Sequence, residues 1–130
     1  MLLVLSTFPD VEKARLVGRQ LVTEKLAACV SLLPKTESFF MWEGAMQTSS
    51  EVLALIKTTE AVYAGLEARL NELHPYDVPE ILALPVSSGL AAYVNWVEAT
   101  LVQPTPLIEK PADSSLPVDP GSHPASLGDQ

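Results

Sequence analysis

The segment from His74 to Ile81, which reads His-Pro-Tyr-Asp-Val-Pro-Glu-Ile, holds the densest set of ligand-forming side chains in the sequence. A neutral imidazole such as that of His74 suits copper, zinc or nickel, and the oxygens of Tyr76 and Glu80 suit a harder divalent cation. The structural alternative is a histidine at a helix end that bonds a carbonyl, followed by solvated acids in a turn bracketed by prolines. From the spacing alone, the structural alternative is favoured.

Cys29 is a further metal candidate, because a thiolate is a soft ligand for copper. It lies in the apolar run from Leu26 to Leu33, where a cysteine is more often an inert buried thiol. The binding and the structural interpretations of Cys29 both stay open.

Lys57 and Trp42 are candidates for lining a cleft between subunits. Lys57 interrupts an apolar strand, which predicts either a bound anion or an ion pair with Glu80 or Glu51. Trp42 follows Phe39 and Phe40 near a turn, and packing between subunits explains these aromatic side chains more simply than a ligand pocket does.

Catalytic motifs are missing from the sequence. It has no Gly-x-Ser-x-Gly, His-Glu-x-x-His or Cys-x-x-Cys, and no phosphate-binding glycine loop. The only histidine besides His74 is His123. We therefore expect a binding protein that is not an enzyme and that uses no organic cofactor.

The charge balance limits the classes of partner. With 16 acidic and 8 basic residues, the formal net charge is −8, which argues against nucleic acid and against anionic membranes. A single cysteine rules out an internal disulfide and suits a reducing compartment. The apolar start Met1–Leu5 is too short for a signal peptide, so we predict a cytoplasmic protein.

Hydrophobic patterning predicts four strands and three helices. Pro34 indicates an edge strand or a bulge, and Glu43-Gly44 indicates the turn of a long hairpin. The expected strands are Leu2–Phe8, Ala27–Leu33 resuming at Glu37–Trp42, Met46–Thr58 and Glu80–Val86, and the helices follow Asp10, Thr59 and Gly89. This order predicts an α+β, ferredoxin-like β-α-β-β-α-β fold with a long central hairpin and a C-terminal helix.

Composition divides the chain into two parts. Residues 1–102 form the predicted domain, whereas residues 103–130 hold six of the eleven prolines and few large apolar residues. Such a Pro/Ser-rich tail is predicted to be disordered. The domain is small, and both crossover helices would cover one sheet face. A symmetric neighbour is the economical cover for the other face.

Five segments, in order, resemble the CutA divalent-cation-tolerance family. They are Leu3–Asp10, Lys25–Val30, Ser38–Gly44, Ile56–Thr58, and His74–Ile81 with the following Ala83–Val86. The resemblance implies a ferredoxin-like homotrimer built through the long hairpins, similar in architecture to PII-type signalling proteins. It also implies binding of Cu(II) or another divalent cation.

Some residues differ from the family pattern. The copper ligands described for bacterial members correspond to Ser6, Leu73 and His74, so one of the three is kept, and Phe40 stands where tyrosine is usual. Two functions follow as hypotheses. The first is a metal-tolerance protein that binds divalent cations. The alternative is a PII-like trimeric sensor or scaffold that takes a small anionic ligand or a partner protein between subunits.

Overall fold

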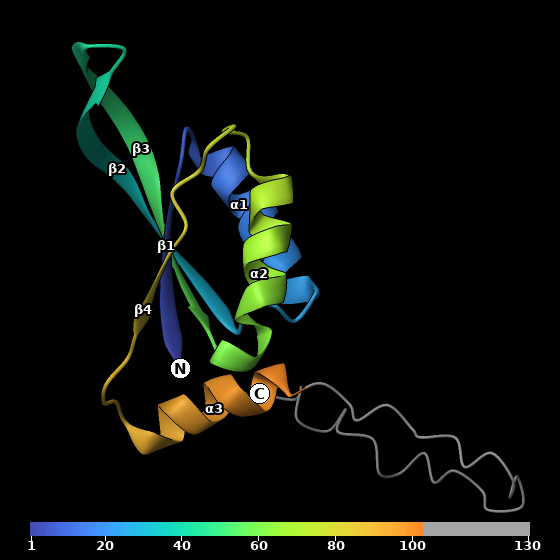
Figure 1. Ribbon diagram of the computed structural model, residues 1–130. Helices are drawn as coiled ribbons and strands as arrows, with labels where there is room; N and C mark the ends of the chain where they lie inside the picture. The colour runs from blue at the N-terminus through green and yellow to red at the C-terminus, as the bar shows by residue number, and fades with distance from the viewer. Residues whose placement is uncertain (103–130) are drawn as a thin grey trace, which may run out of the picture.

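The computed structural model describes residues 1–102, and the predicted disordered tail, 103–130, lies outside the described residues. The elements run in the predicted order β-α-β-β-α-β with a further helix (Figure 1). They are β1 (Leu2–Phe8), α1 (Val11–Thr23), β2 (Cys29–Trp42), β3 (Ala45–Thr58), α2 (Glu60–Leu73), β4 (Leu82–Pro85) and α3 (Ala91–Leu101).

The sheet has four strands in the order β2-β3-β1-β4, and all three strand pairs are antiparallel. Helices α1 and α2 lie together on one face of this sheet, and α3 crosses its end near the N-terminus (Figure 1). The prediction of an α+β, ferredoxin-like chain with a long hairpin and a C-terminal helix is therefore confirmed.

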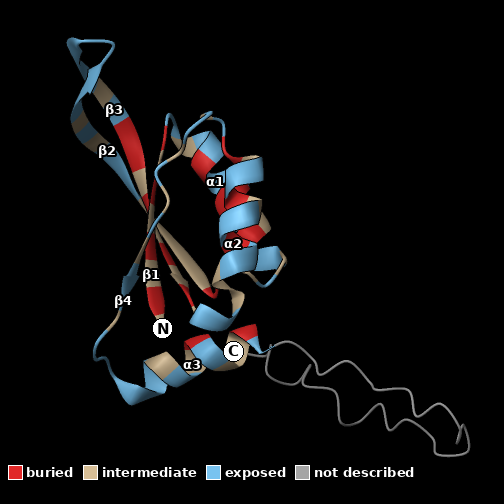
Figure 2. Ribbon diagram, in the orientation of Figure 1, coloured by how far each residue is buried: buried red, intermediate tan, exposed pale blue. Residues whose placement is uncertain are grey.

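The core lies between the sheet and the pair α1–α2. Along β1 every second residue is buried, beginning with Leu2, as expected for a strand with one covered face. Val4 and Phe8 are fully buried there and pack with Ile56 of β3 and Leu66 of α2. Figure 2 shows buried residues concentrated where the sheet meets these helices.

Leucine is the commonest residue on the opposite face of the sheet. Residues opposite one another in an antiparallel pair share a face, so the strand register gathers seven leucines here, which we call the leucine face. They are Leu3, Leu5, Leu33, Leu53, Leu55, Leu82 and Leu84. Three of them are about half exposed, at 46 to 54%, because α1 and α2 lie on the other side.

The hairpin of β2 and β3 projects beyond the rest of the sheet (Figure 1). Pro34 lies in a register shift between Leu33 and Thr36, which confirms the predicted edge strand and bulge. The predicted turn is also present, since Glu43 and Gly44 both adopt positive φ, at 50° and 80°. Beyond the bulge the hairpin leaves large apolar side chains exposed.

The ends of the elements depart from the sequence prediction in small ways. Asp10 caps α1 through a bond from the Lys13 N–H to its carboxylate (2.8 Å). Thr59 precedes α2 as predicted, but its side chain makes no cap hydrogen bond. The fourth strand covers Leu82–Pro85 rather than the predicted 80–86, because only these four residues pair with β1. Similarly, α3 starts at Ala91, two residues after Gly89.

Candidate functional site

His74 ends α2, as the following proline predicts, and its ring turns back onto β1. The ring Nε2–H donates to the carbonyl oxygen of Thr7 (2.8 Å), and Nδ1 accepts from the backbone N–H of Tyr76 (3.1 Å). Since one nitrogen must donate and the other accept, these bonds select the neutral tautomer with the proton on Nε2. Both ring nitrogens are therefore occupied by the protein itself.

Aromatic stacking and a carboxylate extend this arrangement into a chain of contacts, which we call the His74 network. The His74 ring stacks on Phe8 with centroids 4.4 Å apart and lies 5.0 Å from the ring of Tyr76. The Tyr76 hydroxyl donates to Glu51 Oε2 (2.8 Å). The network thus joins the start of the 74–81 loop to both β1 and β3.

The environment fixes the protonation states within the network. Burial lowers the pKa of His74, and the bond to Thr7 and the charge of Glu51 oppose this only partly. Burial also raises the pKa of Tyr76 well above its ordinary value, and the hydrogen bond to Glu51 adds to the effect. At neutral pH the network therefore pairs a neutral imidazole and a protonated phenol with Glu51.

The positions that correspond to bacterial copper ligands do not form a copper centre as they stand here. Ser6 is fully buried, and its hydroxyl has no hydrogen-bond partner among residues 1–102. Leu73 packs against the hydrophobic core, and both nitrogens of His74 are engaged. Within the described part of the chain, no group of three or more His, Cys, Asp or Glu side chains is arranged to hold a metal ion. As they stand in this chain, Ser6, Leu73 and His74 do not fit a copper ion.

The structure brings together only part of the predicted metal set. His74 and Tyr76 lie side by side, whereas Glu80 is exposed just before β4. Cys29 opens β2 and is opposite Lys57, so it belongs to the leucine side of the sheet, away from the core. Binding of a divalent cation by His74, Tyr76, Glu80 and Cys29 stays a prediction.

Lys57 occupies one corner of the leucine face together with Cys29 and Ser31. Its ammonium donates to the Ser31 hydroxyl (2.6 Å) and lies 3.8 Å from the Cys29 sulfur. Neither Glu80 nor Glu51 pairs with it; no described carboxylate lies within 4.0 Å of Lys57, and Glu51 accepts from Tyr76 instead. The ion-pair alternative for Lys57 is therefore wrong within a single chain.

The two residues predicted to line a cleft lie far apart along the hairpin. Trp42 ends β2 at the projecting turn and is 62% exposed, whereas Lys57 is next to the last residue of β3, near the N-terminus. One chain does not bring them together, so a cleft lined by both requires a second chain.

Sequence reasoning missed Glu51, Phe8 and Ser31 as neighbours of the candidate residues. The sequence did contain a signal that Ser31 lies near Cys29, because the two residues are two positions apart and therefore share one face of a strand. Glu51 had none, since 25 residues and a helix separate it from Tyr76. Only the pairing of β1 with β3, which ends at Phe8 and Val52, places it beside the loop.

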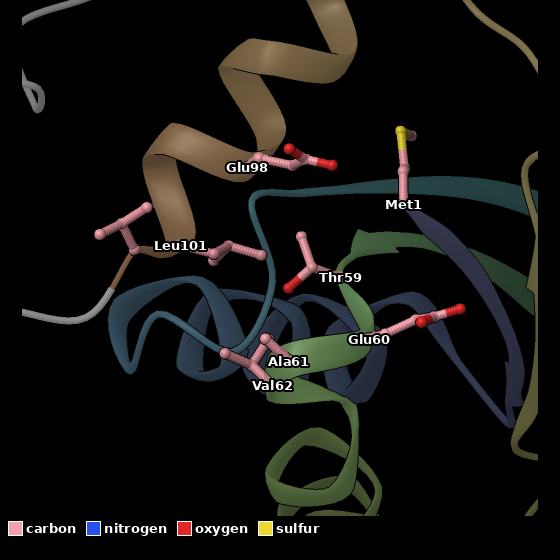
Figure 3. Close-up of a pocket in the computed structure, with 8 residues that line it drawn as sticks. Met1, Thr59, Glu60, Ala61, Val62, Glu98 and Leu101 are labelled. Carbon is pink, nitrogen blue, oxygen red and sulfur yellow. The ribbon is translucent and has the colours of Figure 1, made fainter.

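A separate pocket lies where the N-terminus, the start of α2 and the end of α3 meet (Figure 3). Its lining includes Met1, the carboxylates of Glu60 and Glu98, and the apolar side chains of Val62 and Leu101. None of the predicted binding residues lines it.

The fold is that of a small ferredoxin-like α+β protein, and one apolar face of its sheet is left uncovered by the chain's own helices. The chain matches the family described as CutA1 divalent ion tolerance protein over residues 2–100. It belongs to that family.

Named relatives agree with this assignment. A divalent-cation tolerance protein CutA from Thermus thermophilus is 44% identical over 94 residues, which is 72% of this chain and 91% of that protein. Protein CutA, chloroplastic, from Arabidopsis thaliana is 40% identical over 97 residues, 75% of this chain and 53% of the relative. Neither name describes an enzymatic activity.

Solved structures agree as well. CutA from Xylella fastidiosa superposes with a TM-score of 0.76 at 40% identity, covering 78% of this chain and 97% of that one. A protein from Archaeoglobus fulgidus described as a periplasmic divalent cation tolerance protein CutA gives a TM-score of 0.75 at 32% identity, covering 78% and 100%.

The relatives come from more than one compartment, so the cytoplasmic location stays a prediction. Across the residues that the structure describes, no helix is both long and apolar enough to span a membrane.

Proposed function

We propose that this chain works as a homotrimeric, non-enzymatic binding protein of the divalent-cation tolerance type, with its ligands held between subunits. The observation that carries the proposal is the leucine face. Seven leucines on one side of a four-stranded sheet form an apolar surface of the kind that marks a protein–protein interface.

The projecting hairpin supports assembly in a second way. Phe39, Met41 and Trp42 are 62 to 65% exposed beyond the bulge, in a ribbon that projects past the rest of the sheet (Figure 1). Isolated two-stranded ribbons are marginal in water, so a neighbouring chain that packs against this one would stabilise it. The family resemblance supports three chains as the number.

Cation binding by such a trimer is proposed without a site at His74. A metal there would have to displace either the Thr7 carbonyl or the Tyr76 N–H from the ring. The chain's own residues instead hold the imidazole neutral and buried. Carboxylates at subunit boundaries, including exposed Glu80, are the groups that we expect to meet a cation.

Light scattering and calorimetry test the two parts of the proposal separately. We expect the mass of three chains, and heat on titration with Cu(II), Zn(II) or Ni(II) that His74→Gln leaves unchanged and Glu80→Gln reduces. A mass of one chain would contradict the assembly. Absence of binding by all three metals would contradict the cation role while leaving the trimer standing.

A second candidate function is a PII-like sensor or scaffold that takes a small anionic ligand or a partner between subunits. The observation that favours it is the Lys57 ammonium, which has no carboxylate partner within the described residues. A metabolite that raises the melting temperature through linkage, with no metal effect beside it, would favour this function over the first.

A further inference from the structure

Three polar side chains gather at one corner of the leucine face. Lys57 Nζ, Ser31 Oγ and Cys29 Sγ lie within 2.6 to 4.0 Å of one another.

This corner carries the positive charge of Lys57 and no negative charge from the described residues. Lys57 is half-buried, and in the part of the chain that the structure describes, the three ion pairs involve Lys13 and Arg69 but not Lys57. The partners that it does have are a hydroxyl and a thiol. Among the described residues the Lys57 ammonium therefore has two neutral partners and no opposite charge beside it.

The surroundings of this ammonium are apolar. Leu3 lies directly opposite Lys57 on β1, and Leu84 lies opposite Leu3 on β4. The next row of the same face, counted across the strands, is Ser31, Leu55 and Leu5. If a second chain covers the leucine face, water leaves this corner and the need for a counter-charge becomes greater.

We infer that the corner formed by Lys57, Ser31 and Cys29 binds the carboxylate of a small organic acid whose apolar part lies along the leucine face. The inference rests on the proposed trimer and names the ligand class for its second candidate function. The ammonium and the Ser31 hydroxyl supply charge and hydrogen bonds to the carboxylate oxygens. Leu3 and Leu55 contact the carbon chain.

A carboxylate suits this corner better than a phosphate does. Phosphate sites in proteins usually offer several cationic groups or the free N–H groups of a helix start. Here Lys57 is the only cation of its row across the sheet, beside Cys29, Leu3 and Leu84. One positive charge next to leucines matches a single negative charge on an apolar chain.

The test titrates the full chain by calorimetry with sodium acetate, butyrate and hexanoate, and with inorganic phosphate, at constant ionic strength. We expect affinity to rise about two- to fourfold with each added CH₂ group and phosphate to bind more weakly than hexanoate. Lys57→Met, which removes the charge and keeps an unbranched side chain, is expected to weaken hexanoate binding at least about tenfold. Ser31→Ala is expected to weaken it less.

Lys35→Met is the matched control, because it removes the same charge from an exposed position on the hairpin and is expected to leave hexanoate binding unchanged. Circular dichroism checks that each variant is folded, and the dependence on chain length is measured on the unaltered protein. Equal affinity for acetate and hexanoate, or equal binding by Lys57→Met, overturns the inference.

Light scattering on the same samples separates this inference from the proposed function. A trimer that binds none of the acids overturns the inference alone. A single chain that binds hexanoate through Lys57 upholds the site and overturns the trimer.

Discussion

At the scale of single residues, His74 holds its loop in place through the hydrogen bonds of a neutral ring. Protonation would add a second hydrogen to the ring, and this hydrogen would be on Nδ1, which in the neutral ring accepts from the Tyr76 N–H at 3.1 Å. A proton on Nδ1 facing a backbone donor breaks that bond, so the imidazolium form is disfavoured in addition to the effect of burial. The loop that begins at Pro75 would lose one of its attachments to α2.

The free energy of unfolding should therefore depend on the protonation of His74. Its pKa is lowered in the folded protein, so below its ordinary value of about 6.5 the unfolded chain binds the proton more readily. We expect the stability contribution to be complete above about pH 6.5 and to be lost as the pH falls through the folded pKa, with a slope of at most about 1.4 kcal/mol per pH unit. Urea unfolding from pH 7.5 to 4.5 measures it.

His74→Gln is the control for this dependence, because an amide keeps some hydrogen bonding and does not titrate in this range. His123 and the carboxylates are common to both proteins, so the difference between their curves isolates His74. If the unaltered protein and His74→Gln lose stability in parallel over the whole range, the account of a buried neutral imidazole is wrong.

The role of His74 was only partly predictable from the sequence. Pro75 showed that the helix ends there, and a helix-end histidine bonded to a carbonyl was the structural alternative. Which carbonyl it bonds depends on how α2 returns to β1, and a sequence separation of 67 between His74 and Thr7 leaves no local signal of that return. The same holds for Glu51, which Tyr76 reaches only through the tertiary fold.

At the scale of elements, the turn of the long hairpin depends on backbone conformation rather than on packing. Glu43 and Gly44 have φ values of 50° and 80°, as in the type I′ turns that suit the twist of a two-residue hairpin. A Cβ added at Gly44 would meet no atom within 4 Å. Any cost of substitution there therefore comes from the left-handed conformation alone.

We expect Gly44→Ala to destabilise the protein by about 1 kcal/mol, because an L-residue pays for positive φ. Glu43→Asn is the matched variant, since asparagine tolerates the left-handed region, and it should be neutral or slightly stabilising. Chemical denaturation at one fixed protein concentration compares the two. Equal stability of Gly44→Ala and the unaltered chain would show that the turn relaxes without cost.

The elements were more predictable than their details. Pro34 predicted the bulge, because proline removes an N–H from the hydrogen-bond ladder. No residue in the sequence predicted that the following Lys35 takes a φ of 64°. The fourth strand was predicted too long, because Glu80 and Ile81 fit the strand pattern although the pairing of β4 with β1 ends at Leu82 and Leu5. The pattern gives each element's type, whereas its length depends on where the chain leaves the neighbouring strand.

At the scale of the whole molecule, one asymmetry organises the chain. Both crossover helices cover the same face of the sheet (Figure 1), so the alternation within each strand divides the apolar residues between a closed core and an open surface. Residues such as Leu5 and Leu55 face away from the core at paired positions. The sequence predicted this uncovered face from topology, whereas the isolated corner of Lys57 on it depends on the strand register.

The leucine face predicts that one charge on it separates the subunits without unfolding them. We expect Leu84→Glu, at an edge-strand position that is 46% exposed, to give a folded particle with the mass of one chain, because association would bury an unpaired carboxylate. Leu16→Glu is the matched control, since Leu16 is 72% exposed on α1, outside this face, and should keep the mass of three chains. Light scattering reads the masses, and circular dichroism the fold. Equal masses for the two variants would place the interface elsewhere.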